Sequence, residues 1–247
     1  MTANDKRLDK CRLCGQEKRL CKSHIVPEFC YKRGYEDGKA LQINLKHDGS
    51  QVVRTIQKGL REYLLCETCE ACINSYERRF KEYWYDSPGL PAKMDLGFEG
   101  IRMTGGDFQT MKLFHLSVLW RAGESAWCKA VQLGRYRKSI ADMLVSGDPG
   151  SPDHYPVFGS VLIYDDGTVN HGIVTEPLKS RFGKSTAYCM CYAGCEWHFI
   201  VTDHPSGEEK KLARGVDANG DLWLPYRHWL ESGTVKVAKR LMSRMRR

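Results

Sequence analysis

The sequence lacks any uninterrupted apolar segment long enough to cross a lipid bilayer, which argues against a membrane-spanning protein. It begins Met-Thr-Ala-Asn-Asp-Lys-Arg and so lacks the apolar stretch of a secretory signal peptide. Internal repeats and low-complexity tracts are also absent, which excludes solenoid folds. We therefore expect a cytoplasmic protein that has no membrane partner.

The composition is that of an ordinary folded protein. Apolar residues make up 42% of the 247 residues, enough for one large domain or two small ones with a sizeable core. The formal net charge of +8 favours an acidic partner such as nucleic acid, although a basic surface that serves only solubility is equally compatible. The eleven cysteines, an odd number without a signal peptide, indicate reduced thiols and thiolate chemistry rather than disulfides.

Two cysteine pairs have the spacing of metal ligands: Cys11-x-x-Cys14 and Cys66-x-x-Cys69. Each pair can bend the backbone so that two thiolates point at one ion, so together they predict a structural, tetrahedral zinc site. A further pair, Cys69-x-x-Cys72, overlaps the second one. We favour Cys66 with Cys69 because a short apolar strand precedes them and a helix follows.

The segment Ser23-His24-Ile25-Val26-Pro27 lies between the two cysteine pairs. A histidine held next to a rigid metal-built scaffold is a candidate general base, because its unperturbed pKa lies close to physiological pH. The alternative for His24 is a buried imidazole that bonds a backbone carbonyl in a scaffold without chemistry.

The pattern of apolar residues predicts an α+β fold. The N-terminal region, residues 8–88, is expected to contain a hairpin over 41–56 and a helix that starts near Glu67. Residues 108–247 are expected to contain more helices, a mostly antiparallel sheet and a basic C-terminal helix. The expected helices there cover 111–120, about 124–145 and about 226–247, and the expected strands cover 157–164, 172–175 and 187–202.

The N-terminal third resembles the four-cysteine form of the HNH nuclease family, and more closely a subset with a Ser-His-Ile-x-Pro core. The matching segments are Cys11-x-x-Cys14, Ser23–Pro27 and Leu64-Leu65-Cys66-Glu67-Thr68-Cys69-Glu70. The resemblance covers about residues 8–85. It implies a treble-clef ββα fold in which a structural zinc holds the ends together around one catalytic divalent ion.

The resemblance also implies roles for individual residues. His24 would be the general base that deprotonates a water, and Glu70 would take the metal-binding position on the final helix, where it suits Mg²⁺ or Mn²⁺. The sequence departs from the family at two positions. Ser23 stands where the family has an acidic metal ligand, and the Asn expected before Leu64 is missing.

The catalytic ion has a candidate ligand set on the helix after Cys69. Glu70, Asn74 and Glu77 fall at i, i+4 and i+7 and share one helical face. The alternative is a solvated face in which Glu77 pairs with Lys81.

The C-terminal helix is the candidate nucleic-acid contact, because its basic residues have no acidic neighbours. These residues are Lys236, Lys239, Arg240, Arg244, Arg246 and Arg247.

Three functions follow from these features. The leading hypothesis is a metal-dependent endonuclease that cleaves phosphodiester bonds, with DNA as the favoured substrate and defence against foreign DNA as the expected role. The second is a non-catalytic, zinc-stabilised nucleic-acid-binding protein with a degenerate site. The third is an adaptor that binds a partner subunit. The sequence leaves the oligomeric state open, and a homo-oligomer is compatible with it.

Overall fold

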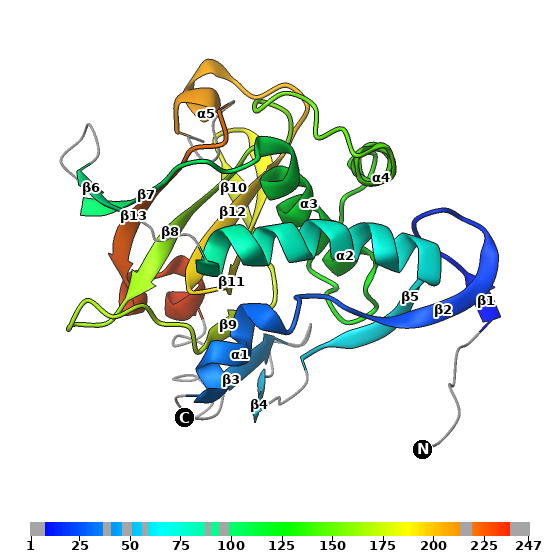
Figure 1. The fold of residues 1–247 in the computed structure, drawn as a ribbon, viewed down its shortest axis with the longest axis horizontal. Coiled ribbons are helices and arrows are strands. Elements are labelled where there is room, and N and C mark those ends of the chain that lie inside the picture. The colour runs from blue at the N-terminus through cyan, green and yellow to red at the C-terminus, as the bar shows by residue number, and fades with distance from the viewer. Residues whose placement is uncertain are drawn as a thin grey trace.

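A computed structural model describes residues 8–36, 41–45, 51–55, 59–86, 90–93, 99–212 and 219–237. Within these ranges the fold is mixed α+β, with five α-helices and mostly antiparallel strands, which confirms the α+β class and the mostly antiparallel sheet of the prediction (Figure 1). The helices are α1 (Phe29–Glu36), α2 (Glu67–Lys81), α3 (Phe108–Glu124), α4 (Tyr136–Ser146) and α5 (Gly207–Leu212). No helix in the described ranges combines the length and the apolar character that a bilayer span requires.

The N-terminal region is built on a three-stranded antiparallel sheet in the order β1-β2-β5. Its strands are β1 (Leu8–Lys10), β2 (Glu17–His24) and β5 (Arg61–Cys66). Leu20 pairs with Cys66 and His24 with Arg61, with a bulge between Cys21 and Lys22. Helix α2 begins at the residue after β5, so two paired strands lead directly into a helix.

The chain between β2 and β5 forms α1 and the strands β3 (Leu41–Leu45) and β4 (Gln51–Thr55). Strands β3 and β4 pair antiparallel, which confirms the predicted hairpin. β3 also pairs in parallel with β9 (Ile173–Thr175), so the predicted strand near residue 173 exists but belongs to this small sheet.

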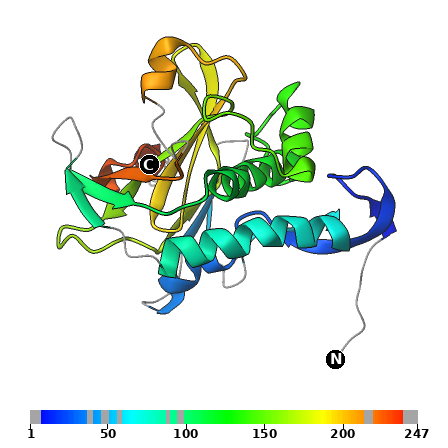
Figure 2. The same cartoon turned by 45° about the horizontal axis from the view of Figure 1, so that its top comes forward.

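Helices α2 and α3 lie side by side in both views (Figures 1 and 2). Helix α2 starts where the sequence predicts and buries Ile73 and Phe80. It continues into a π-helical turn, Glu82–Asp86. Helix α3 is buried at every position from 110 to 122, as expected for an apolar helix inside the molecule.

The predicted helix over about 124–145 begins too early. Glu124 ends α3, and α4 starts only at Tyr136. The Glu62 carboxylate accepts hydrogen bonds from the Ser125 hydroxyl and from the backbone N–H of Ala126, which holds the chain after α3 in a non-helical turn. Helix α4 stops at Gly147, as predicted, in the left-handed conformation that favours glycine (φ 74°).

The C-terminal half is organised around a seven-stranded sheet in the order β10-β11-β12-β8-β13-β7-β6. All described neighbours are antiparallel except β13 and β8. The strands are β6 (Leu90–Lys93), β7 (Glu99–Met103), β8 (Val157–Ile163), β10 (Leu178–Phe182), β11 (Ser185–Tyr192), β12 (Cys195–Val201) and β13 (Leu222–His228).

The predicted start of the last helix at Tyr226 is wrong, because Tyr226 lies in β13. Leu222 and Leu224 are both fully buried, the alternation of a strand with one face on the core, and Pro225 between them and Tyr226 disfavours a helix. A 3₁₀ turn (Trp229–Glu231) follows, and the described helical segment is confined to residues 233–237.

One hydrophobic core joins the N-terminal and C-terminal regions. Phe80 of α2 stacks on Phe114 of α3 with ring centroids 3.7 Å apart. The indole of Trp84 donates a hydrogen bond to the carbonyl of Ala193, and the Ala193 N–H donates to the carbonyl of Cys30. Residues 8–88 and 108–247 therefore share packing and backbone bonds across the predicted boundary.

Candidate metal centre and the adjacent histidine

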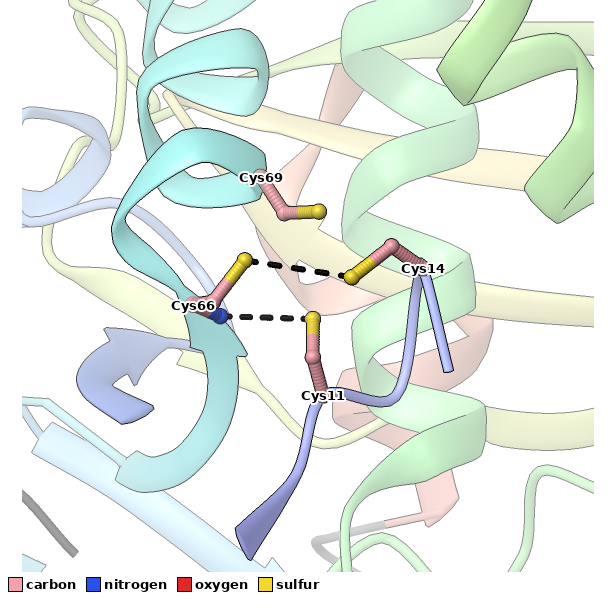
Figure 3. Close-up of side chains that lie close together, drawn as sticks. All are labelled: Cys11, Cys14, Cys66 and Cys69. Carbon is pink, nitrogen blue, oxygen red and sulfur yellow. Dashed lines mark hydrogen bonds between the residues drawn. The ribbon is translucent and has the colours of Figure 1, made fainter. Parts of the chain in front are cut away.

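Cys11, Cys14, Cys66 and Cys69 converge on one point, with all four Sγ atoms within 4.8 Å of one another (Figure 3). A tetrahedral zinc with Zn–S bonds of about 2.3 Å would place its sulfurs about 3.8 Å apart. The Sγ atoms of Cys14 and Cys66 are 3.9 Å apart. The four thiols therefore fit a zinc ion, and the predicted four-cysteine metal site is confirmed as a cluster able to hold one.

The first pair of cysteines lies on a tight turn between β1 and β2. The Gly15 N–H donates to the carbonyl of Cys11, and Gly15 adopts the left-handed conformation (φ 71°) that such a turn needs. The second pair spans the junction of β5 and α2. A turn and a strand–helix junction from distant parts of the sequence are thus brought together by the pairing of β2 with β5.

Backbone N–H groups already favour a thiolate at this site. The Cys66 N–H donates to the Sγ of Cys11. Burial alone would raise the pKa of Cys11, but hydrogen bonds from the backbone of Cys14, Cys66 and Leu13 outweigh it and lower the pKa to about 7. Burial and the neighbouring cysteines of the cluster raise the pKa of Cys69.

The structure decides between the overlapping cysteine pairs. Cys72 lies outside the cluster, and its thiol donates to the Leu144 carbonyl and the Tyr76 hydroxyl instead. Among the residues that the structure describes, the four-cysteine cluster is the only group of three or more His, Cys, Asp or Glu ligands within reach of one ion.

His24 is the last residue of β2 and is half-buried. The residues that follow it explain why it is fixed there. Ile25 and Val26 are buried in the core, and the Ile25 N–H donates to the Leu60 carbonyl. The carbonyl of His24 accepts a hydrogen bond of 2.7 Å from Nη1 of Arg121 in α3. The buried side chains of Ile25 and Val26 and the hydrogen bond from Ile25 to Leu60 therefore fix the position of His24.

Ser23 and Glu70 are in direct contact. The Ser23 hydroxyl, fully buried, donates a hydrogen bond of 2.5 Å to Oε2 of Glu70 in the first turn of α2. Ser23 and His24 alternate along the strand, so their side chains point to opposite faces of β2. The first turn of α2 thus lies against the residue that immediately precedes the histidine.

On the predicted face of Glu70, Asn74 and Glu77, the two carboxylates have different partners. Asn74 is exposed, while Glu77 lies 2.7 Å from Nη1 of Arg121 rather than pairing with Lys81. Seven residues separate Glu70 from Glu77, which is about 10 Å along the helix axis. Burial raises the pKa of Glu77, and the Arg121 guanidinium opposes this shift. Each carboxylate therefore has its own protein partner.

Arg121 and Glu62 are the polar residues near His24 that the sequence did not single out. Arg121 is 1% exposed within an otherwise apolar helix. The sequence does contain a signal for Arg121: it is a charged residue within an otherwise apolar helical segment. A charge buried in this way requires a partner. The identity of that partner depends on packing between segments far apart in the chain.

The predicted nucleic-acid contact is described only at its start. Lys236 is exposed at the end of the helical segment 233–237. The other five residues of that prediction lie outside the described residues: Lys239, Arg240, Arg244, Arg246 and Arg247.

Comparison of the chain with protein-family models, with curated proteins and with solved structures found no match in any of the three.

Proposed function

We propose that the protein is an HNH-like, metal-dependent endonuclease that cleaves phosphodiester bonds of nucleic acid, with DNA as the favoured substrate. In this proposal β2, β5 and α2 form the treble-clef ββα module, and the four cysteines hold its structural zinc. The observation that carries the proposal is the contact of Ser23 with Glu70. These are the two positions at which the resemblance places ligands of the catalytic ion, and Ser23 immediately precedes His24 in β2.

Ser23 and Glu70 suit a hard divalent cation only in part. Ser23 and Glu70 offer oxygen ligands, and Mg²⁺ commonly binds through one or two carboxylates while it keeps several waters. Glu77 forms an ion pair with Arg121, so we do not assign Glu77 to the catalytic ion. When bound, Mg²⁺ or Mn²⁺ would stabilise charge on the phosphate. His24 would take a proton from the attacking water.

We place this activity in the cytoplasm, because a thiolate zinc site needs cysteines that stay reduced. All eleven cysteines of the chain are free thiols in the structure. Defence against foreign DNA is the role we propose for an enzyme of this kind.

A second candidate function is nucleic-acid binding without cleavage. It is favoured by the hydroxyl of Ser23 in place of an acidic ligand, since a hydroxyl binds Mg²⁺ more weakly than a carboxylate does. This candidate predicts binding that weakens steeply with salt and no metal-stimulated cutting.

The test is nicking of supercoiled plasmid by the full chain in Mg²⁺ or Mn²⁺, with a His24→Ala variant. We expect His24→Ala to lower the nicking rate by about 10²- to 10⁴-fold, the usual contribution of a general base. Zinc content and thermal unfolding should stay as in the wild type. His204→Ala is the matched control, because His204 is exposed and far from the metal centre in sequence.

Full cleavage by His24→Ala would remove His24 from the mechanism. Salt-sensitive binding of DNA without nicking by the wild type would favour the second candidate function.

A further inference from the structure

Arg121 is a charged side chain in a position that normally excludes charge. It is 1% exposed, and the residues of α3 from 110 to 122 are all buried. Burying a guanidinium costs several kcal/mol unless its N–H groups and its charge find partners. The structure supplies these partners from three different segments.

The contacts of Arg121 link β2, α2 and α3. Nη1 donates to the carbonyl of His24 at 2.7 Å and lies 2.7 Å from Oε1 of Glu77. Nε donates to the carbonyl of Ser117 at 3.2 Å, and Nη2 donates to the Ser117 hydroxyl at 3.4 Å. The guanidinium is a rigid planar fork, so fixing it against Ser117 also fixes where Nη1 can meet His24 and Glu77.

The hydrogen bond from Arg121 to the His24 carbonyl lies at the end of the β2–β5 pairing. His24 is the last residue of β2 to pair with β5, and the next backbone bond runs from Ile25 to Leu60. The peptide group between His24 and Ile25 is therefore held on two sides: its N–H donates to the Leu60 carbonyl and its carbonyl accepts from Arg121. A shift of that peptide would move the imidazole attached to the same residue.

We propose that Arg121 is a positioning residue for His24, so that helix α3 completes a site whose other parts lie in the N-terminal region. The two residues are 97 positions apart in the sequence. This proposal rests on the proposed nuclease function. Lysine cannot replace Arg121 in this role, because one ammonium group lacks the fixed fork that reaches Ser117 and His24 together.

A purely structural ion pair makes a different prediction. Loss of such a pair would lower the free energy of unfolding and leave the rate constant of the folded enzyme unchanged. A positioning residue lowers kcat and leaves KM unchanged, because a misplacement of about 1 Å costs about 10²-fold in rate while DNA binding elsewhere persists.

The experiment measures kcat and KM for plasmid nicking by the zinc-loaded full chain and its variants. We expect Arg121→Met and Arg121→Lys each to lower kcat about 10- to 100-fold, with KM within about twofold of the wild type. The ¹³C shift of the His24 carbonyl should move in both variants. Arg135→Met is the matched control, because Arg135 forms an exposed ion pair with Asp203.

Arg121→Met leaves the Glu77 carboxylate buried without its cation, so this variant can fail to fold. The double variant Arg121→Met/Glu77→Leu removes both charges, which is often neutral for stability. It should fold, and it should show the same loss of kcat. Glu77→Gln alone keeps the donor to His24 and should retain most of kcat.

Wild-type kcat in the folded double variant, or in Arg121→Lys, would overturn the positioning role and leave the nuclease proposal standing. Absence of nicking by the wild type would overturn the proposed function and this role with it. A fall in kcat for Glu77→Gln as large as that for Arg121→Met would also overturn the role, because it would assign the effect to the carboxylate.

Discussion

In the three-stranded sheet, every residue of β1 and the first three residues of β2 are exposed, whereas in the seven-stranded sheet six consecutive residues of β11 are buried. The β1–β2 hairpin lies at the N-terminal end of α2, away from the larger sheet (Figure 1). A hairpin end that buries so little apolar surface cannot offset the entropy of ordering its chain. The four-cysteine cluster lies at this hairpin, where a bound metal would compensate for the small area of buried apolar surface.

The seven-stranded sheet needs no such support. It packs against α3, and Trp197, Tyr192 and Phe199 are buried in the core with aromatic neighbours. Its buried polar group, Glu196, is fully paired with hydroxyl and N–H donors. We therefore expect metal ligation to hold the first region and apolar packing to hold the second, so different perturbations should damage each.

Loss of the metal should have the largest effect, confined to the first region. Cys66→Ser should abolish zinc binding, because a hydroxyl does not replace a thiolate, and structural zinc sites contribute roughly 10–16 kcal/mol of apparent binding free energy. Hydrogen exchange should show opening of residues 8–24 and 59–66 while β11 and β12 stay protected. Cys72→Ser, one turn of α2 beyond Cys69, is the matched control and should keep its zinc.

Equal loss of hydrogen-exchange protection in β11 and in the three-stranded sheet would contradict this difference between the two regions. It would show that the metal holds the whole molecule together.

Loss of packing between α2 and α3 should have the next largest effect. Phe80 is fully buried between Phe114 and Trp84, so Phe80→Ala should lower the free energy of unfolding by about 3–5 kcal/mol. Zinc content should be unchanged in the folded fraction. Chemical denaturation with zinc analysis checks both, and Trp127→Ala, at an exposed aromatic, is the control that should cost little.

A smaller effect is expected from Glu196 at low pH. Burial alone would raise its pKa, but bonds from His198 and Thr234 outweigh it and hold the pKa at about 2, below the ordinary value of 4.5. A lowered pKa in the folded state stabilises the fold above pH 4.5, and the contribution is lost as the pH falls from about 4.5 to 2. A shift of this size corresponds to about 3 kcal/mol.

Glu196→Gln should therefore destabilise the protein at pH 7 and flatten its stability between pH 4.5 and 2, measured against the wild type by denaturation. Acid also protonates the zinc thiolates, so the difference between variants isolates the carboxylate. Glu231→Gln, at an exposed position, is the control. An unchanged pH profile in Glu196→Gln would remove Glu196 from the stability of the sheet.

The sequence predicted those features that depend on local pattern. The spacing of Cys66 and Cys69 and the apolar stripe through Ile73 and Phe80 placed the second cysteine pair at the start of α2, as observed. The partial alternation over residues 41–56 placed the β3–β4 hairpin correctly, and the β-branched and aromatic residues around β8, β11 and β12 placed those strands.

The features that were missed depend on contacts between distant residues. Nothing local to Arg121 reveals that its guanidinium meets the carbonyl of His24, because the buried helix α3 gives no indication of which polar group it faces. The late start of α4 follows from Glu62 binding the chain after α3, another distant contact. At Tyr226 the basic residues further along the chain obscured the strand alternation of Leu222 and Leu224.

Zinc K-edge absorption spectroscopy of the full chain, purified under reducing conditions, tests the central claim most directly. The account predicts one bound zinc with four sulfur ligands at about 2.3 Å. Purified protein without a bound transition metal, or a zinc whose first coordination sphere contains oxygen or nitrogen in place of any of the four sulfurs, would contradict it.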